Sequence, residues 1–453
     1  MTASRRRTGG GPAGAEPLVG VEGLKKHFGG DGLLGDPVRA VDGVSFTVGQ
    51  GETLGLVGES GCGKTTLGRT LVGLDEATAG TVEYRGTDVR SLSGEARREW
   101  ERNAQLVFQD PEGALDDRMT VGEIVREPLD AHGWGTPAER RGRVFEFLDR
   151  VGLGEEHYYR YPHQFSGGQR QRVGIARALV LEPEFVVLDE PVSALDVSVQ
   201  ARIINLLEDL QDAFGLAYLF VAHDLSVVRH IADRVAVMYL GTVVETGPTE
   251  QVFASPTHPY TASLLSAIPG TVARESVGAD RDRITLRGTP PNPRDPPPGC
   301  PFATRCPAKI RPEGVEAPEA VWAALDEFRA LLRERARSDT SLGDVLARLL
   351  GRGADSVAVA REDLFGDLTV PAAVAAELDA AVDLARRGRD REAARHLRDR
   401  LGSVCDRTCP EEREAAPGQF SRCLRNDDAH DDTRTVLDRR FEGRGDGGSE
   451  AGR

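Results

Sequence analysis

The stretch Gly58-Glu59-Ser60-Gly61-Cys62-Gly63-Lys64-Thr65 constrains the fold of this chain more than any other feature. It follows a short apolar run, Thr53–Val57, and precedes a segment of helical character from Lys64 to Val72. Glycines at these positions let successive backbone N–H groups turn toward a phosphate at the positive end of a helix. The alternative is a chance glycine-rich turn before a helix, and the strand on one side with the helix on the other argues against it. The stretch therefore predicts a phosphate-binding loop at the end of a buried strand.

Side chains in the same stretch supply the remaining chemistry that a bound triphosphate requires. The ammonium of Lys64 would neutralise the β- and γ-phosphates, and the hydroxyl of Thr65 would ligate Mg²⁺. Cys62 has the simpler interpretation of a small side chain that fills space. The residues expected to bind the nucleotide here are Gly58, Ser60, Gly61, Cys62, Gly63, Lys64, Thr65 and Thr66.

A second apolar run ends in two carboxylates. Phe185–Leu188 reads as a buried strand, and Asp189 and Glu190 follow it directly. Asp189 would contact Mg²⁺, directly or through water, and Glu190 would polarise the attacking water. An apolar strand that ends in Asp-Glu is common, so this pattern alone is weak evidence for a Mg²⁺ site. It becomes strong evidence because the same chain contains the lysine-bearing loop. Together the two patterns predict a site for Mg²⁺ and a nucleoside triphosphate.

Three further polar features refine this prediction. Ser166-Gly167-Gly168-Gln169 is a small-residue turn before the helix Arg170–Leu179, and a second helix N-terminus of this kind can hold a γ-phosphate. Two such turns beside one lysine-bearing loop suggest that one turn serves a nucleotide held by another subunit. Gln109 would sense Mg²⁺ or water, and His223 would bond the γ-phosphate. Taken singly, Gln109 reads as a polar loop residue and His223 as a capped strand-end histidine, but their order and spacing in one chain favour the functional interpretation.

Strand and helix patterns alternate over residues 17–270, and residues 110–165 are largely helical. This alternation predicts a first domain with a mostly parallel sheet covered by helices on both faces. A proline-rich linker at 271–299 follows. The strands expected in this domain are Leu18–Phe28, Val38–Val48, Thr53–Val57, Glu184–Leu188, Tyr218–Ala222 and Arg234–Tyr239, and the helices include Lys64–Val72, Val121–Leu129, Glu139–Val151 and Val199–Phe214.

The remainder of the chain reads as a separate extension over residues 300–424. Two amphipathic stretches, Glu319–Arg337 and Val370–Leu401, predict helices within it. Residues 1–16 and 425–453 are rich in glycine and charge, and we expect both ends to be disordered.

Composition indicates which partners and which cellular location to expect for this chain. The formal net charge is −15, whereas a protein whose main partner is nucleic acid carries a basic stripe. No apolar run is long enough to span a bilayer, and the Arg5–Arg7 cluster precedes no apolar segment of a signal peptide. We expect a cytosolic chain in which any membrane association runs through a partner. Six cysteines in such a chain indicate metal or catalysis before disulfides.

In their order along the chain these features resemble those of the ABC ATPases. The similarity covers about residues 17–270 and implies a P-loop NTPase (RecA-like) α/β core with an antiparallel β subdomain and an α-helical subdomain. The matching features are the Walker A loop 58–65, Gln109, the signature turn Ser166–Gln169, the Walker B strand with Asp189, the D-loop Ser193–Asp196 and His223.

The resemblance implies a mechanism and a set of partners. Two cassettes would close head to tail on two ATP molecules, and the Ser166–Gln169 turn and Asp196 would reach the nucleotide of the partner. Glu190 would act as general base, Gln109 and Asp189 would serve Mg²⁺, and His223 would position the γ-phosphate. Phe28, or alternatively His27, would stack on adenine. A second ATPase subunit, identical or homologous, and two membrane permeases would be partners, which places the chain at the cytoplasmic face of the membrane.

More narrowly, the chain resembles ATP-binding subunits of dipeptide and oligopeptide importers, which an extracytoplasmic binding protein feeds. A departure is Asp116-Asp117, which stands where Asn-Pro is more usual before Arg118-Met119-Thr120. Nickel or sugar importers, and soluble ABC ATPases that act on nucleic acid or ribosomes, are the alternatives. The strings that carry this resemblance are Tyr161–Arg172, Asp189–Ala201, His258–Thr261 and Gly299–Pro307.

The same family resemblance bears on the cysteines. Related subunits carry a C-terminal cysteine quartet thought to hold a [4Fe–4S] cluster, for which four thiolates are needed. The corresponding residues here would be Cys300, Cys306, Cys405 (or Cys409) and Cys423. This sequence departs from the family by a helical insertion at about 309–403 between the second and third of them. Zn²⁺ and unligated thiols remain alternatives to the cluster.

Overall fold

The computed structural model describes residues 17–29, 36–268, 284–286, 288–338 and 354–441. They form two compact units, each with its own core. The first contains residues 17–256, 268 and 414–421, and the second contains the other described residues, from 257 onward. Residues 1–16, which were expected to be disordered, and residues 271–283 of the predicted proline-rich linker lie outside the described residues.

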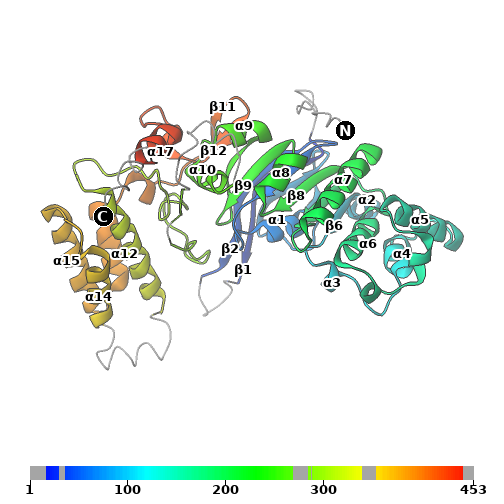
Figure 1. Ribbon diagram of the computed structural model, residues 1–453, viewed down its shortest axis with the longest axis horizontal. Coiled ribbons are helices and arrows are strands. Elements are labelled where there is room, and N and C mark those ends of the chain that lie inside the picture. The colour runs from blue at the N-terminus through cyan, green and yellow to red at the C-terminus, as the bar shows by residue number, and fades with distance from the viewer. Residues whose placement is uncertain (1–16, 30–35, 269–283, 287, 339–353, 442–453) are drawn as a thin grey trace, which may run out of the picture. The chain divides into compact units, whose positions relative to one another are not determined.

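The first unit contains a small antiparallel sheet and a large mixed sheet (Figure 1). The small sheet has the order β2-β1-β4-β5, and Val19 of β1 pairs with Val48 on one side and Tyr84 on the other. This is the antiparallel subdomain that the family resemblance implied. Its strands are β1 (Val19–Phe28), β2 (Val38–Val48), β4 (Ala79–Tyr84) and β5 (Thr87–Asp88).

The large sheet has eight strands in the order β11-β12-β10-β9-β3-β8-β7-β6. The five strands from β9 to β6 are parallel, which confirms the predicted α/β class. Every residue of β3, β7 and β8 is buried, as expected of strands covered on both faces. The strands are β3 (Thr53–Val57), β6 (Ala104–Val107), β7 (Phe185–Asp189), β8 (Ala217–Ala222), β9 (Arg234–Tyr239), β10 (Thr242–Pro248), β11 (Arg413–Ala416) and β12 (Gln419–Ser421).

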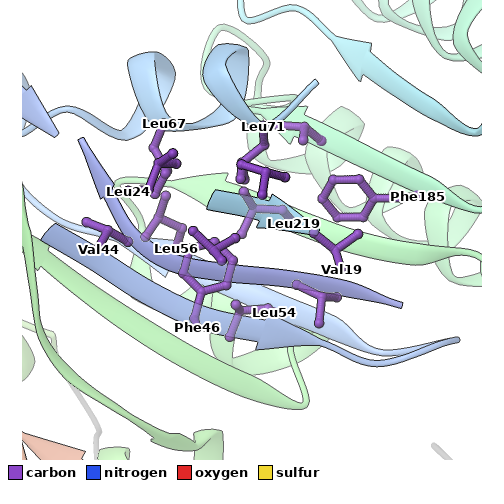
Figure 2. Packing of buried hydrophobic residues seen from close by; sticks show 14 of the residues in the cluster. Val19, Leu24, Val44, Phe46, Leu54, Leu56, Leu67, Leu71, Phe185 and Leu219 are labelled. Carbon is purple, nitrogen blue, oxygen red and sulfur yellow. The ribbon is translucent and has the colours of Figure 1, made fainter. Parts of the chain in front are cut away.

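The first core lies where helix α1 (Lys64–Leu71) meets both sheets. Figure 2 shows Leu67 and Leu71 of α1 pointing at Leu56 and Leu219 of the large sheet, with the side chains of β1 and β2 beside them. Each such side chain contributes about 1.5–3 kcal/mol when it is fully buried. This packing fixes α1, whose first residue is Lys64, against the sheet from which the loop 58–63 leaves at the end of β3.

The remaining helices of the first unit include a group formed by α3, α4, α5 and α6 (Figure 1). Thr120 and Thr136 begin α4 and α5 with capping boxes, which satisfy the free N–H groups of the first turn. The helices are α2 (Gly94–Asn103), α3 (Pro111–Ala114), α4 (Val121–Ala131), α5 (Pro137–Arg150), α6 (Gly167–Leu179), α7 (Val197–Phe214), α8 (Leu225–Ile231) and α9 (Thr249–Ala254).

The second unit is mainly helical, with a core built by Leu325, Phe328, Leu378 and Leu397 among other residues. The stretch predicted at Val370–Leu401 is two helices, because Gly388 adopts a positive φ of 75° between them and reverses the chain. The helices are α10 (Pro259–Ser266), α12 (Glu319–Ser338), α14 (Ala354–Phe365), α15 (Ala372–Arg386), α16 (Asp390–Leu401) and α17 (Thr433–Phe441).

Two stretches near the C-terminus differ from the sequence-based expectation. Residues from Arg425 were expected to be disordered, yet α17 forms there because Thr433 and Leu437 are buried. Residues 414–421, which were assigned to the extension, belong to the first unit, where they contribute to strands β11 and β12 and Glu245 of β10 pairs with Ser421.

Candidate functional site

The loop between β3 and α1 has the backbone geometry that a phosphate cradle requires. Gly61 and Gly63 adopt positive φ values of 78° and 108°, and no side chain caps the N-terminus of α1. A Cβ atom on Gly63 would lie 1.9 Å from the carbonyl oxygen of Ala40, and one on Gly58 would lie 2.2 Å from that of Met238. Only glycine therefore fits at these two positions.

Lys64 is the cation of this loop and is only 5% exposed. Its Nζ atom donates to the carbonyl oxygens of Gly58 at 2.8 Å and Glu59 at 3.2 Å, and it lies 3.9 Å from Oε1 of Glu190. The lysine is therefore folded back over its own loop, where its charge faces whatever the loop binds.

Cys62 lies beside this lysine, inside the loop, and is 6% exposed. Burial raises the pKa of its thiol. The neutral, buried side chain agrees with the interpretation of Cys62 as a filler of space.

Thr65 and Asp189 form a donor set suited to Mg²⁺. The Thr65 hydroxyl donates to Oδ1 of Asp189 at 3.1 Å, and the carboxylate is 4% exposed at the end of β7. Burial, and secondarily the charge of Glu190, raise the pKa of Asp189. A buried carboxylate beside a hydroxyl favours a hard cation with oxygen ligands, so these residues fit Mg²⁺.

Glu190 joins three of the predicted site residues. Its Oε2 atom accepts a hydrogen bond from Nε2 of Gln109 and lies beside Nδ1 of His223, both at 3.1 Å, while Oε1 faces Lys64. Its side chain is 11% exposed, whereas that of His223 is 53% exposed. The carboxylate is thus oriented by Gln109 and His223 at the mouth of the phosphate loop.

The backbone of Glu190 is in the left-handed region, with φ of 45°. A non-glycine residue pays about 1–3 kcal/mol for such a conformation, which persists only where neighbouring structure enforces it. Here the Glu190 N–H donates to the carbonyl of Val221, and the Ser193 hydroxyl donates to the carbonyl of Glu190. The strained backbone turns the side chain out of the strand direction and toward Gln109 and His223.

The Ser166–Gln169 turn is organised as a helix N-terminus. Ser166 caps α6, and its N–H and hydroxyl are paired with Gln169 in a capping box. Ser166 and Gly167 are exposed, and a Cβ on Gly168 would lie 2.5 Å from Val199 of α7. Asp196 caps α7 through the Val199 N–H. The two helix starts therefore lie close together, with the exposed Ser166–Gly167 backbone directed outward.

Phe28 ends β1 and is 41% exposed, so its ring is open to a stacking partner. The ammonium of Lys26 lies 4.8 Å from the ring centroid and donates to the carbonyl of Glu76. The His27 ring instead lies 3.1 Å from Asp42. Of the two residues expected to stack on adenine, Phe28 has the exposed ring, whereas His27 faces Asp42. Lys26, which the sequence did not single out, lies against the Phe28 ring.

The cysteines of the extension were expected to hold a metal cluster. Cys300 donates its N–H to the carbonyl of Cys405, and burial first, with neighbouring thiols after it, raises the pKa of Cys300 and Cys306. Burial also raises the pKa of Cys423 to about 11, while Cys409 is exposed. The thiols gather, but in the described parts of the chain no group of three or more His, Cys, Asp or Glu residues is arranged to hold a metal. The geometry therefore gives the iron–sulfur and zinc interpretations no support.

Fold and site together define a P-loop ATPase. Residues 41–193 match the family described as ABC transporter, and residues 244–311 match the C-terminal region of oligopeptide/dipeptide transporters. Residues 319–418 match a domain of unknown function.

Several characterised relatives are similar over most of their length. Oligopeptide transport ATP-binding protein AppF of Bacillus subtilis is 52% identical over 301 residues, which are 65% of this chain and 91% of that one. A putative peptide import ATP-binding protein of Brucella ovis is 48% identical over 70% of this chain and 98% of its own. Dipeptide transport ATP-binding protein DppF of Haemophilus influenzae is 51% identical over 64% and 88%.

Among solved structures, cbiO1 of Clostridium perfringens, part of the cbiONQ ABC transporter complex, is 29% identical. It covers 53% of this chain and 92% of its own, with a TM-score of 0.47. From the sequence relatives, this chain belongs to the oligopeptide/dipeptide family of ABC transporter ATP-binding proteins, whose activity is ATP hydrolysis.

Proposed function

We propose that this chain is the ATP-hydrolysing subunit of an importer for dipeptides or oligopeptides. The observation that carries the proposal is the position of Glu190, whose carboxylate lies between Gln109, His223 and Lys64 at the phosphate loop. A carboxylate oriented by neighbouring groups within hydrogen-bond reach of a bound water has the geometry of a general base.

The hydrolytic roles follow from these contacts. Lys64 leaves its carbonyl partners and neutralises the β- and γ-phosphates, while the open N–H groups of the loop bind their oxygens. Glu190 accepts the proton of the attacking water, and His223 and Gln109 hold the carboxylate and the γ-phosphate in line. Mg²⁺, when bound by Thr65 and Asp189, would offset negative charge on the phosphates.

A second cassette completes the site. The Ser166–Gly167 N-terminus of α6 is exposed, although it has the N–H groups and dipole that favour a phosphate. This turn would reach the nucleotide of a second copy or a homologous subunit, and Asp196, which caps the adjoining α7, would lie at the same interface.

The transport role is supported by the relatives, which are named for oligopeptide, peptide and dipeptide transport. In the described residues, no helix combines the length and hydrophobicity that crossing a membrane requires. In an importer of this kind two permease subunits would form the path, with this chain bound to their cytoplasmic side and an extracytoplasmic protein delivering the peptide. These relatives are named for peptide transport, which favours peptides over nickel or sugars as the cargo. The same names favour a role in transport over a role on nucleic acid.

The experiment that tests the hydrolytic part is Glu190→Gln. We expect ATP binding to persist, turnover to fall by about 10²–10⁴-fold as on loss of a general base, and an ATP-bound dimer to accumulate on gel filtration. Gln keeps the shape of the side chain and removes its basicity. Hydrolysis at the normal rate would refute the role of Glu190. Reconstitution with the candidate permeases would then test whether peptide uptake depends on ATP.

A further inference from the structure

The helical extension has a surface feature that the ATPase site does not use. Helices α15 and α16 form an antiparallel pair that packs on α12 around Leu378, Leu397 and Leu401. These helices lie in the segment that matches a domain of unknown function. Because they share a core of their own, they hold their outer side chains on a fixed scaffold.

The turn that joins α15 to α16, with α16 itself, is locally basic. Residues 386–400 contain seven arginines and three acidic residues, a net charge of +4 within a chain of −15. The arginines are Arg386, Arg387, Arg389, Arg391, Arg395, Arg398 and Arg400.

Part of this charge is compensated by ion pairs at the surface of the helices. Arg389 pairs with Glu392, and Arg400 pairs with Glu377. These two arginines already have a carboxylate partner, so the surface considered below leaves them out.

Four of the other five arginines are exposed, and Arg398 is partly buried. Arg386, Arg391 and Arg395 are exposed and have no carboxylate partner in the parts of the chain that the structure describes. Arg387 lies 3.8 Å from Asp383 with 68% of its side chain exposed, and Arg398 pairs only with its neighbour Asp399. We call these five residues the arginine cluster.

Helical spacing places part of the arginine cluster on one stripe. Asp390, Ala393, Leu397 and Leu401 form the buried face of α16. Arg391, Arg395 and Arg398 follow at intervals of four and three residues, so they share a side of the helix away from that face. Two of these three guanidinium groups, those of Arg391 and Arg395, have no carboxylate partner among the described residues. Such a row matches a surface that carries many phosphates, since each group can bind two phosphate oxygens at once.

Two anionic surfaces could match such a row, and the observations favour lipid. Binding of single-stranded nucleic acid uses aromatic side chains on which bases stack, and residues 386–400 contain no Phe, Tyr or Trp. Clusters of four to eight basic residues on an amphipathic helix are typical of binding to anionic lipid headgroups.

We propose that the arginine cluster binds the anionic lipid headgroups of the membrane on which the ATPase works. The inference rests on the proposed position of this subunit at the cytoplasmic face of a membrane. The contact is electrostatic and shallow, because the stripe presents guanidinium groups rather than apolar side chains. The subunit would then bind the bilayer through this contact as well as binding the permeases.

The test is sedimentation of the purified full chain with vesicles of phosphatidylcholine alone or with phosphatidylglycerol. The variant is Arg386→Gln with Arg391→Gln and Arg395→Gln, since Gln keeps the helix propensity of Arg. The control is Arg98→Gln with Arg413→Gln and Arg439→Gln, which removes equal charge from exposed arginines that pair with carboxylates.

We expect wild type and control to sediment with phosphatidylglycerol vesicles and not with phosphatidylcholine, and binding to weaken as salt rises. At about 1 kcal/mol per arginine, the cluster variant should bind on the order of a hundredfold more weakly. Failure of wild type to sediment at about 0.15 M salt, equal losses in both triple variants, or displacement of vesicles by duplex DNA at matched phosphate would each overturn the proposal. ATP hydrolysis is measured in the same samples. Normal hydrolysis without vesicle binding would overturn only the lipid proposal, whereas loss of hydrolysis in wild type would count against the proposed function.

Discussion

The Nδ1 atom of His223 lies 3.1 Å from Oε2 of Glu190, and the two residues follow the C-terminal ends of neighbouring parallel strands, β8 and β7. The strained backbone of Glu190, with φ of 45°, brings its carboxylate to this position. The pair therefore depends on strand register as well as on residue type, and each partner can be tested separately.

His223→Ala should lower kcat at least tenfold and leave the KM for ATP within a few-fold of wild type. The reason is that the histidine contacts Glu190 and is half exposed, whereas nucleotide affinity depends on the loop around Lys64. Steady-state phosphate release measures both constants. His230→Ala provides a control, since that histidine is exposed and lies 3.9 Å from Glu208. A large rise in KM with unchanged kcat would contradict the positioning role.

Asp189→Asn should stabilise the protein in the absence of Mg²⁺ and remove the stabilisation that Mg²⁺ gives. Burial raises the folded-state pKa of Asp189 above its unfolded value. The folded state then binds more protons in the interval between the two values, so stability falls as pH rises through that interval. Above that interval the whole penalty is present, and the neutral amide of Asn removes it.

Thermal melts of this variant with and without Mg²⁺ at neutral pH measure both effects. Asp209→Asn is the matched control, because that carboxylate is exposed on α7. A lower melting temperature for Asp189→Asn without Mg²⁺, or an unchanged response to the ion, would show that the carboxylate is not the desolvated Mg²⁺ ligand described above.

Much of the first unit was predictable because its signals are local. An apolar run followed by glycines is enough to place β3 and Lys64, and the Ser166–Gln169 pattern is enough to place the start of α6. The pairing of β12 with β10 was not predictable in this way. Gln419 and Ser421 are buried while Phe420 is exposed, the reverse of the usual apolar-inward pattern, and the partner Glu245 lies far away in the sequence. The position of Lys26 beside Phe28 likewise depends on the carbonyl of Glu76 from another segment.

Lys309→Met should destabilise the helical extension by about 3–5 kcal/mol, the usual cost of breaking a buried ion pair on one side. Its side chain is 2% exposed and contacts Asp326 of α12 at 2.6 Å and Asp406 at 2.9 Å. Hydrogen exchange of the α12 amides measures the local free energy of opening. Arg361→Met is the control, because its pair with Asp379 is exposed and worth at most about 1 kcal/mol. Equal protection in both variants would refute the prediction.

The same ion cluster predicts an acid sensitivity of the extension. Although burial acts to raise it, the charges of Lys309 and Arg329 hold the pKa of Asp406 below its ordinary value. The stability that the ionised Asp406 gives to the extension is therefore fully present above the unfolded-state pKa. This stability is lost as pH falls through the folded-state value. Protection of α12 should decline in that acidic interval in wild type, and the decline should be weaker in Lys309→Met.

Thiol labelling of the native chain should distinguish Cys409 from the other cysteines of the extension. Cys409 is exposed, whereas burial raises the pKa of Cys300, Cys306 and Cys423 and so suppresses the reactive thiolate. A neutral maleimide followed by peptide mass spectrometry should modify Cys409 first, and Cys409→Ser should remove this fast phase while the slow phase remains. Fast modification of the buried thiols would contradict their burial. Iron and sulfide in anaerobically purified protein, with slow labelling of all five, would instead show that the thiols are ligands and would reinstate the cluster that the geometry does not support.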